Sequence, residues 1–375
     1  MAPPGRDDQR ENHADLFFHA ASPLPRGLAS SAAGVTVARF RTGFLGENVS
    51  SSNRKKVLVP DTLAEAGWAL LRPRGDIEAI RYSPSIAPDP FRKLLPEAEG
   101  VVLSLTAFRE PEAAAAPKLR VVCRIGVGYD TVEVPALTKR RVPLMITGTA
   151  NSISVAEHAL YFILTLAKRG VVQDALVRGG RWNERYGSMP AELAGKTVLV
   201  IGFGRIGTRS AARCRAFDMT VLVYDPYVSA ETVRAAGCEP VADLDAALPR
   251  ADFVTVHCPK NPETTGLLGA ARLGRMKRSA YVVNTARGGI VDEAALLAAL
   301  NEGRIAGAGL DVFVQEPLPT DSPLLKSDRI ITAPHMAGVT TESVDKMTTA
   351  AVGNMLSVLD GNPRRENVVN AEVLG

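Results

Sequence analysis

Residues 196–225 read KTVLVIGFGRIGTRSAARCRAFDMTVLVYD, and this stretch decides the fold. The apolar run 198–201 leads directly into three glycines with the spacing G-x-G-x-x-G, and a second apolar run, 221–224, ends on an aspartate. A strand, a glycine turn, a helix and a second strand are therefore expected in that order. In such a unit the turn and the N-terminus of the helix bind the pyrophosphate of a dinucleotide.

Each glycine of this motif has its own physical reason. Gly202 allows a tight turn, Gly204 lets the backbone approach a pyrophosphate, and Gly207 lets the helix pack closely on the strand. Asp225 can accept hydrogen bonds from the ribose hydroxyls of adenosine but would repel a 2′-phosphate, so NAD is favoured over NADP. No basic residue follows in residues 226–229, which supports the same prediction.

The composition is that of a globular protein with more than one core. The chain has 375 residues, of which 46% are hydrophobic and 5% aromatic. Two domains of ordinary size are expected, and an aromatic platform for nucleic acid is not. The net charge of +4 is a small difference between 44 basic and 40 acidic side chains, and the basic clusters are short and scattered. We therefore expect no nucleic-acid partner.

The cysteines and the longest apolar run bear on the compartment. The chain has four cysteines far apart, with no C-x-x-C pair and no histidines near them at metal-ligand spacing: Cys123, Cys214, Cys238 and Cys258. Reduced thiols, no metal site and a cytoplasmic location are expected. The apolar run 159–167 is too short for a membrane span, which takes roughly 18 residues, so no membrane partner is expected.

The chain changes character near residue 54. Residues 1–53 mix Pro, Gly, Ser, Asn and charged residues without periodicity, which predicts a disordered or loosely attached extension. Beyond it, short apolar runs alternate with segments of helical character, and this alternation predicts parallel sheets covered on both faces. Six strands are expected in the sheet that begins with the run 198–201, and a final helix is expected over 341–359.

Two further helices carry end signals. Ser154 and Glu157 have the spacing of a capping box, which predicts a helix that opens there and runs to about Lys168. Its apolar residues go nearly all the way round, so burial between domains or subunits is expected, with His158 satisfied inside that interface rather than functional. The other helix is expected from an N-cap at Asp292 to a terminal glycine at position 303.

Polar residues follow four of the apolar runs, in segments 257–259, 284–288, 311–317 and 332–338. In an open α/β sheet, ligands bind beyond the carboxyl ends of the strands. Taken singly, each segment has an ordinary explanation, such as an exposed arginine or a loop histidine. Their common position at strand ends makes them a candidate site.

These segments belong to an ordered set of motifs: RIGVGYD (124–130), NSISVAEH (151–158), GFGRIG (202–207), HCP (257–259), NTARGG (284–289), DVFVQEP (311–317) and APHMAG (333–338). The set resembles the D-isomer-specific 2-hydroxyacid dehydrogenases, a family that includes D-3-phosphoglycerate dehydrogenase, glyoxylate/hydroxypyruvate reductase, D-lactate dehydrogenase and formate dehydrogenase. The resemblance covers about residues 56–370. It implies an NAD-dependent enzyme that acts on the CH–OH group of a D-2-hydroxy acid.

The resemblance also implies a domain organisation. A Rossmann NAD-binding domain, residues 152–336, would be inserted into a flavodoxin-like substrate domain made of residues 54–151 and 337–375. Both domains would be doubly wound α/β folds with parallel sheets. A homodimer formed through the cofactor domains is implied as well.

The resemblance places the catalytic residues at Arg287, Glu316 and His335, and their chemistry agrees. Hydride transfer from C2 of a hydroxy acid requires the hydroxyl proton to leave, and a histidine suits that task in both directions. Glu316 would hydrogen-bond the other imidazole nitrogen and fix its tautomer. Arg287, always charged and forked, would hold the substrate carboxylate and polarise the carbonyl oxygen.

The remaining site residues follow from the same motifs. Arg124, Val127 and Gly128 would bind the anionic substrate together with Arg287, because the glycines of segment 126–128 let backbone N–H groups approach it. Asp311 is assigned to placement of the nicotinamide amide. The predicted cofactor-binding residues are Gly202, Gly204, Arg205, Ile206, Gly207, Asp225, Cys258, Pro259, Thr264, Thr285, Ala286, Arg287, Asp311 and His335.

The substrate stays open among 2-keto acids. The segments 124–130 and 147–158 look most like phosphoglycerate dehydrogenase-type members, and glyoxylate, hydroxypyruvate or a bulkier keto acid are alternatives. A hypothesis of another class is an NAD-sensing binding protein like the C-terminal-binding corepressors, which share this scaffold and its catalytic trio. Turnover of keto acids would separate the two classes, because a retained trio does not.

Overall fold

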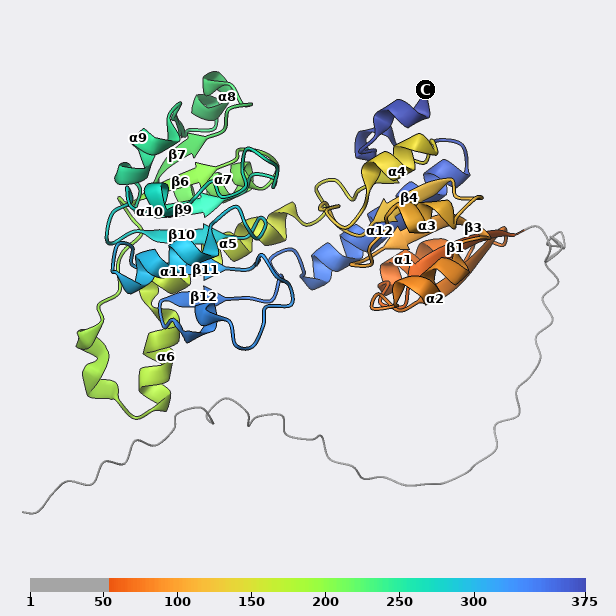
Figure 1. Cartoon of the computed structure of the whole chain (residues 1–375). Helices are drawn as coiled ribbons and strands as arrows, with labels where there is room; N and C mark the ends of the chain where they lie inside the picture. The colour runs from red at the N-terminus through yellow and green to blue at the C-terminus, as the bar shows by residue number, and fades with distance from the viewer. Residues whose placement is uncertain (1–53) are drawn as a thin grey trace, which may run out of the picture. The chain divides into compact units, whose positions relative to one another are not determined.

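The computed structural model describes residues 54–375, and the extension predicted over residues 1–53 lies outside the described residues. Two parallel β-sheets form within the described part, one of five strands and one of seven. Figure 1 shows helices around each sheet, and the prediction of two doubly wound α/β folds is confirmed. In the part of the chain that the structure describes, no helix is both long and apolar enough to cross a membrane.

The first sheet has the strand order β2-β1-β3-β4-β5, which is the flavodoxin-like order. Its strands are β1 (Lys55–Pro60), β2 (Ile77–Tyr82), β3 (Ala98–Leu103), β4 (Val121–Arg124) and β5 (Leu144–Met145). The helices between them are α1 (Glu65–Leu71), α2 (Pro88–Leu94), α3 (Glu110–Ala114) and α4 (Val134–Lys139). Alternate residues of each strand enter two different cores, as in β1, where Leu58 joins one core and Val57 and Val59 join the other.

The predicted last helix, α12 (Thr341–Leu359), belongs to this first sheet although the whole second sheet precedes it in the chain. Ala351, Val352 and Met355 of α12 lie in the core that contains Val57 and Val59. A capping box between Thr340 and Ser343 opens the helix. The chain thus leaves the first fold, forms the second and returns.

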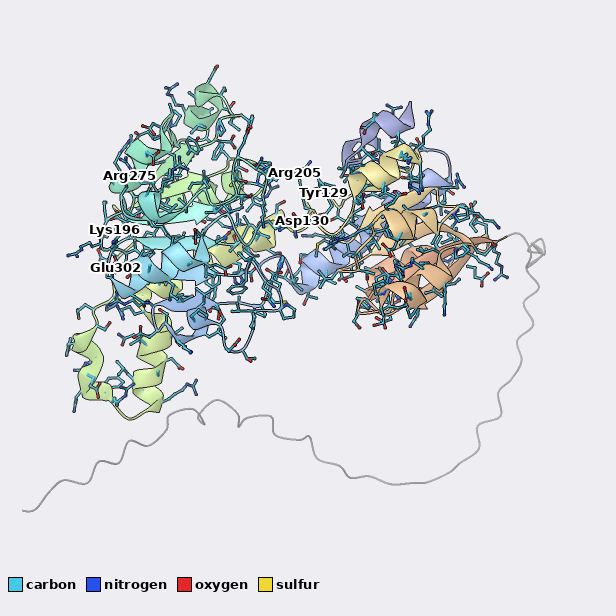
Figure 2. The ribbon with its side chains drawn as sticks, in the orientation of Figure 1. Tyr129, Asp130, Lys196, Arg205, Arg275 and Glu302 are labelled. Atoms are coloured by element: carbon cyan, nitrogen blue, oxygen red, sulfur yellow. The ribbon has the colours of Figure 1, made fainter. Side chains whose placement is uncertain are left out.

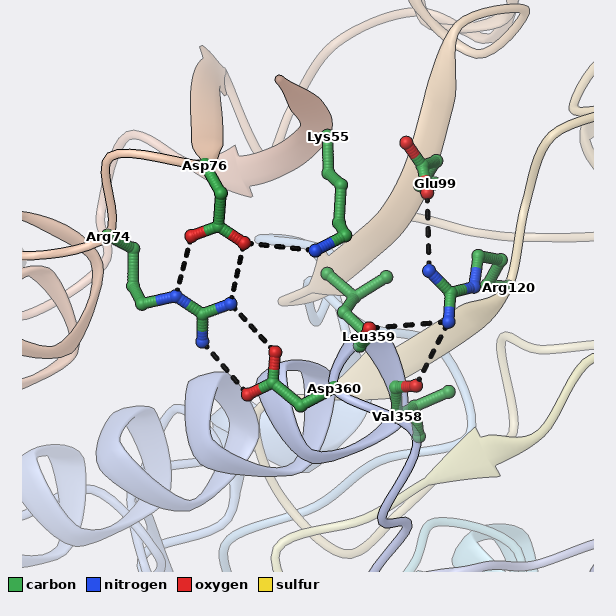
Figure 3. A network of polar contacts seen from close by, with 8 residues as sticks. All are labelled: Lys55, Arg74, Asp76, Glu99, Arg120, Val358, Leu359 and Asp360. Atoms are coloured by element: carbon green, nitrogen blue, oxygen red, sulfur yellow. Dashed lines mark hydrogen bonds and ion pairs between the residues drawn. The ribbon is translucent and has the colours of Figure 1, made fainter. Parts of the chain in front are cut away.

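Polar contacts fix the end of α12 to the first sheet, as Figure 3 shows. Arg74 bonds Asp76 through Nε at 2.8 Å and Asp360 through Nη2 at 2.7 Å. Arg120 donates to the carbonyl oxygens of Val358 and Leu359, both at 3.3 Å. These carbonyls are among the last of the helix and have no partner within it, so Arg120 satisfies groups that the helix leaves open.

The second sheet has the order β12-β11-β10-β9-β6-β7-β8. Its strands are β6 (Thr197–Ile201), β7 (Thr220–Tyr224), β8 (Glu239–Pro240), β9 (Phe253–Val256), β10 (Tyr281–Asn284), β11 (Gly307–Leu310) and β12 (Ile330–Thr332). From β6 the order runs outward in both directions, which is the dinucleotide-binding arrangement with one strand added beyond β11. The order in which successive strands are added reverses between β6 and β9, and this switch point is where dinucleotides bind in such sheets.

Helices cover both faces of the second sheet. They are α5 (Ser152–Lys168), α7 (Gly207–Ala216), α8 (Ala230–Ala235), α9 (Leu244–Ala247), α10 (Ala270–Leu273) and α11 (Glu293–Asn301). The helix α6 (Gly170–Arg178) follows α5 and extends away from the sheet (Figure 1). Val198 and Val200 of β6 pack with α5 and α7, whereas Leu199 and Ile201 face the core that contains α11. Both faces of β6 are buried, which explains why it reads as a continuous apolar run.

Two predictions about these elements are wrong. The second sheet has a seventh strand, β8, which was missed because it has two residues and one of them is Pro240. The capping box at Ser154 does not form, because α5 begins at Ser152 and Asn151 is its N-cap residue. Ser154 instead shares a hydrogen bond with Thr340 at 3.1 Å. The predicted N-cap at Asp292 is confirmed, since its side chain accepts from the amide of Ala295.

Candidate active site

The glycine turn after β6 has the shape that a pyrophosphate requires. Gly202 has φ +91°, and a Cβ there would lie 2.6 Å from the amide nitrogen of Cys258. A Cβ on Gly207 would lie 1.9 Å from the carbonyl oxygen of Gly202. Gly204 has no neighbour within 4 Å of its Cβ position, so open space lies in front of it. The turn is closed on the protein side and open at Gly204, which fits a dinucleotide bound against the N-terminus of α7.

Asp225 lies beside this turn at the end of β7. Its Oδ2 accepts from the amide of Phe203 at 2.7 Å, and its Oδ1 accepts from the amide of Tyr227 at 2.9 Å. Each carboxylate oxygen keeps a second lone pair, so both can still accept ribose hydroxyls. Arg205 of the turn donates to the carbonyl oxygen of Gly148 at 3.3 Å, and Ile206 is the N-cap residue of α7.

The loop after β9 holds three predicted cofactor residues, Cys258, Pro259 and Thr264. The hydroxyl of Thr264 donates to the carbonyl oxygen of Pro259 at 2.6 Å, which closes a compact turn. Cys258 is packed against Gly202 of the glycine turn. His257 before it has a buried Nδ1 without a partner, and burial lowers its pKa to about 3, so this histidine is a neutral structural residue.

His335 and Glu316 form a pair. The Nδ1 atom of His335 lies 2.7 Å from Oε2 of Glu316, and the other oxygen of Glu316 accepts from the amide of Phe313 at 2.9 Å. Glu316 is thus fixed by its own loop and fixes the ring in turn. The pairing leaves Nε2 as the free ring nitrogen of His335, a side chain that is 44% exposed. A group from solvent or substrate can therefore reach the ring.

Asp311 holds the backbone that carries His335. Its carboxylate accepts from the amides of Met336 at 2.7 Å and Ala337 at 2.9 Å, and its carbonyl oxygen accepts from the amide of His335 at 2.8 Å. His335 has φ +56°, a left-handed conformation that a non-glycine residue rarely adopts. Asp311 is only 1% exposed, and this burial raises the pKa of its carboxyl group. The motif assigned Asp311 to the cofactor, and this contact with the histidine loop was not foreseen.

Arg287 lies on the turn after β10. Its Nε donates to Asp130 at 2.8 Å, its Nη1 donates to the carbonyl oxygen of Ala286 at 2.7 Å, and a Cβ on Gly128 would lie 1.5 Å from its Nη2. Only glycine at position 128 leaves room for this guanidinium. Asp130 was not among the predicted site residues, although its place in the 124–130 motif was a signal that could have identified it.

Hydrogen bonds between residues of the same turn stabilise the turn that carries Arg287. Asn284 donates to the carbonyl oxygen of Arg287 at 2.9 Å and accepts from the amide of Ala286 at 3.1 Å. Thr285 has a buried hydroxyl without a partner, which is an open hydrogen-bonding group among the predicted cofactor residues. Gly288 packs so closely on the 311–317 segment that a Cβ would lie 1.9 Å from the carbonyl oxygen of Phe313. Among residues 54–375, no hydrogen bond or ion pair joins Arg287 directly to Glu316 or His335.

Arg124 adds a second cation to this region. It donates to the carbonyl oxygen of Ile125, its Nε is buried without a partner, and its Nη1 would lie 3.6 Å from a Cβ on Gly126. Burial and the neighbouring Arg287 lower the pKa of Arg124 to about 10. Of these two guanidinium groups only that of Arg287 pairs with a carboxylate, Asp130, among the described residues, which leaves an excess of positive charge next to segment 126–128.

His158 does not meet its prediction in full. Its ring lies edge-on to Phe162 with centroids 4.7 Å apart and to Tyr161 at 5.4 Å, so it packs among aromatic side chains as a structural histidine would. Its Nε2 atom is buried and has no hydrogen-bond partner among residues 54–375, however, and burial lowers its pKa. The imidazole is therefore packed but not satisfied.

Comparisons with known proteins agree with this geometry. The family model described as D-isomer specific 2-hydroxyacid dehydrogenase, NAD binding domain, matches residues 160–337. These residues include the glycine turn and Asp225, and they also include Arg287, Glu316 and His335. Part of the chain that contains the second sheet is thus an NAD-binding domain.

Individual relatives extend the match beyond that domain. D-3-phosphoglycerate dehydrogenase of Archaeoglobus fulgidus is 39% identical over 316 residues, 84% of this chain and 59% of the relative. Glyoxylate reductase of Thermofilum pendens is 37% identical over 328 residues, 86% of this chain and 96% of the relative. The structure of NAD-dependent formate dehydrogenase from Staphylococcus aureus in complex with NAD has a TM-score of 0.74 and 27% identity, covering 84% of this chain and 98% of that one.

The chain spans about three fifths of the length of the phosphoglycerate dehydrogenases that it matches. It spans nearly all of the glyoxylate reductase at more than a third identity. All strands of the second sheet fall within the residues that the family model matches. The chain belongs to the family of D-isomer specific 2-hydroxyacid dehydrogenases.

Proposed function

We propose that the protein is an NAD-dependent oxidoreductase that interconverts a D-2-hydroxy acid and the corresponding 2-keto acid. The observation that carries the proposal is the 2.7 Å contact of His335 with Glu316 in the NAD-binding domain. When bound, the nicotinamide supplies or accepts the hydride. The residues of this chain would bind and orient the acid and move its hydroxyl proton.

His335 is proposed as the general acid and base. Its Nδ1 is tied to Glu316, so its Nε2 would donate the proton to the carbonyl oxygen of a keto acid, or take it from the hydroxyl of a hydroxy acid. Glu316 would keep the ring oriented and fix its tautomer through this hydrogen bond. The exposure of the ring is compatible with access of a small acid.

Arg287 is proposed to hold the substrate carboxylate. Asp130 and the carbonyl oxygen of Ala286 occupy Nε and Nη1, and Nη2 faces Gly128 without a hydrogen bond among the described residues. A carboxylate bound there would meet Nη2 and the backbone of Val127 and Gly128. Arg124, a second partly buried arginine nearby, would favour an anion further.

The predicted cofactor set and domain ranges are part of this proposal. The shape of the glycine turn supports Gly202, Gly204, Arg205, Ile206 and Gly207 at the pyrophosphate, and the position of Asp225 supports a contact with the adenosine ribose. The packing of α5 with the second sheet and of α12 with the first supports the division at 151/152 and 336/337.

For the substrate, a phosphoglycerate dehydrogenase-like activity is the more specific proposal. It is supported by the relatives named D-3-phosphoglycerate dehydrogenase and by the positive excess around Arg124 and Arg287. Glyoxylate or hydroxypyruvate reduction is the alternative, and the relative named glyoxylate reductase supports it because it matches along nearly its whole length. An NAD-sensing protein without turnover is the alternative of another class.

A homodimer in the cytoplasm completes the proposal. The segment from α5 to the short helix η2 (Trp182–Gly187) carries exposed large apolar side chains, which are typical of a protein interface. They are Tyr161, Val171, Val177, Trp182, Tyr186 and Met189. All four cysteines are free thiols, as expected in a reducing compartment.

The experiment is a panel of 2-keto acids offered with NADH, followed by the loss of NADH absorbance. The panel contains glyoxylate, hydroxypyruvate and its 3-phosphate, and bulkier keto acids. Turnover of any member, abolished in His335→Ala without loss of NADH binding, supports the enzyme. Tight NADH binding without turnover of any member would favour the sensor instead.

A further inference from the structure

Tyr227 and Glu263 join two loops on either side of the glycine turn. Tyr227 follows β7 and Glu263 follows β9, and the Tyr227 hydroxyl donates to Oε2 of Glu263 at 2.7 Å. In the sheet, β6 lies between these two strands. Because neighbouring strands are about 4.8 Å apart, the two loops start roughly 10 Å from each other. The side chains therefore bridge the two flanks of the strand end that carries the glycine turn.

Tyr227 also connects this bridge to Asp225. Its amide donates to Oδ1 of Asp225 at 2.9 Å, while its hydroxyl bonds Glu263. The Tyr227 side chain is otherwise open to solvent. The hydrogen bond and charge of Glu263, with a further contribution from Asp225, raise the pKa of the Tyr227 phenol. The carboxylates of Asp225 and Glu263 thus both act on the same small region next to the glycine turn.

The position of Glu263 does not depend on Tyr227 alone. Asn261 accepts from the amides of Glu263 and Thr264 at 2.9 Å each, and its own amide donates to the hydroxyl of Thr264 at 2.9 Å. This turn is built from backbone groups and two other side chains. Replacing the Glu263 carboxylate therefore leaves the turn intact and removes mainly a charge.

We propose that Glu263 is a second residue, besides Asp225, that selects NAD over NADP, and that Tyr227 holds the two carboxylates on either side of the adenosine end of the cofactor. NADP differs from NAD by a 2′-phosphate with about two negative charges, and two fixed carboxylates repel it. The ribose hydroxyls of NAD carry no charge and can donate to carboxylates. The inference goes beyond the proposed function, because it concerns binding and needs no turnover.

The test compares the dissociation constants of NADH and NADPH, measured by nicotinamide fluorescence without any keto acid. Glu263→Gln should tighten NADPH about fivefold, the effect expected of one unit charge on two unit charges roughly 8 Å away in water. NADH binding should stay within about twofold. The gain should shrink at high salt, because exposed charges are screened. Glu263→Gln combined with Asp225→Asn should favour NADPH more than either change alone.

Two further variants separate charge from structure. Glu302→Gln removes an exposed acid of the same domain, and Figure 2 shows Glu302 well away from Arg205 of the glycine turn. This control should leave both constants unchanged. Tyr227→Phe keeps both charges but removes the hydrogen bond that holds the Glu263 carboxylate, so it should shift the preference towards NADPH by clearly less than Glu263→Gln does.

The inference is wrong if Glu263→Gln changes NADH and NADPH binding equally, because Glu263 would then only brace the loop. It is also wrong if Tyr227→Phe changes the preference as much as Glu263→Gln does. Failure of the proposed enzymatic activity would not affect either result, since both constants are measured without substrate.

Discussion

At the scale of single residues, the candidate site depends on one residue in an unusual conformation. His335 has a left-handed φ of +56°, which costs on the order of 1 kcal/mol for a residue with a Cβ. Three hydrogen bonds to Asp311 compensate for this cost by fixing the backbone of residues 335–337. The ring is then held against Glu316, so both the position and the orientation of the imidazole are determined.

The Glu316→Gln variant tests the pairing. An amide is a weaker acceptor than a carboxylate and can also present its NH2 group to the ring, so the imidazole is less well oriented and kcat should fall about 10- to 100-fold. NADH affinity should stay within about twofold, because the cofactor is bound chiefly by the glycine turn and Asp225. Steady-state kinetics and NADH fluorescence measure the two quantities.

The matched control for that variant is Glu293→Gln. Glu293 accepts from the amide of Val314 at 2.6 Å and so contacts the same loop without reaching the histidine. The kcat of Glu293→Gln should change by less than about threefold, which is the effect expected from one backbone hydrogen bond on an exposed loop. An equal loss of kcat in the two variants would show that loop rigidity, rather than the contact with His335, explains the effect.

The Asp311→Asn variant tests the role of Asp311 in two ways. Asparagine accepts at one oxygen only, so one of the amides at 336 and 337 loses its partner and kcat should fall at least tenfold. If Asp311 holds the histidine loop, NADH affinity should fall much less than kcat. If kcat and NADH affinity fall by similar factors, Asp311 acts in cofactor placement, as its motif suggested.

The raised pKa of Asp311 predicts a pH dependence of stability, which the same variant tests. Burial raises the folded-state pKa of Asp311 above its ordinary value of 3.8. A raised pKa means that the stabilising contribution is complete below the unfolded-state pKa and is lost as the pH rises through the folded-state pKa. The free energy of unfolding of the wild type, minus that of Asp311→Asn, should therefore decrease from about pH 4 to pH 7. Urea unfolding at several pH values measures it, and an increase would contradict the assignment.

At the scale of elements, α12 shows how the first sheet depends on a segment far away in the sequence. Met355 is fully buried, and its sulfur would lie 2.9 Å from a Cβ on Gly100 of β3. Helix and strand are thus in close contact at a glycine. The ion pairs of Arg74 and Asp360 lie at the surface and contribute little by comparison.

Met355→Ala should therefore lower the free energy of unfolding by about 2–5 kcal/mol, through lost burial and the cavity left behind. The matched control is Leu325→Ala, a large-to-small change at a side chain that is 48% exposed, with an expected effect within about 1 kcal/mol. Chemical denaturation of the two variants measures the difference. A loss below 1 kcal/mol in Met355→Ala would mean that α12 is not a structural part of the first fold.

At the scale of the whole molecule, the segment 161–189 keeps large apolar side chains exposed after one chain has folded. Several of its large side chains are more than half exposed, including Trp182 and Tyr186. Arg185 lies over both rings, at 5.5 and 4.5 Å from their centroids, which keeps the aromatic surface ordered. In the proposed homodimer, a second copy of the chain would cover this apolar surface.

Trp182→Glu together with Tyr186→Glu should convert the dimer to a monomer, because two charges would be buried at the centre of an apolar contact. Light scattering during gel filtration measures the mass. Phe217→Glu, a similar change at an exposed aromatic residue outside the segment, should leave the mass unchanged. A wild-type protein that elutes as a monomer would contradict the proposal.

The sequence by itself determined the features that depend on local patterns. Strands buried on both faces read as apolar runs, so the run 198–201 and its glycines identified β6, the turn and α7 without any tertiary information. The cap at Asp292 and the helix 341–359 were likewise predicted from local signals, an N-capping side chain and a helical pattern. The motifs that carry the family resemblance also named Arg287, Glu316 and His335, in segments that follow strands.

Only the tertiary structure decided which groups meet across the chain. The two-residue strand β8 forms because it pairs with the edge of β7. Ser154 was predicted to cap α5, but α5 begins at Ser152, and Ser154 bonds Thr340 instead. The contacts of Arg287 with Asp130 and of Tyr227 with Glu263 join residues that are distant in sequence. Such pairs depend on the order of strands in the sheet and on the packing of loops, and no local pattern encodes either one.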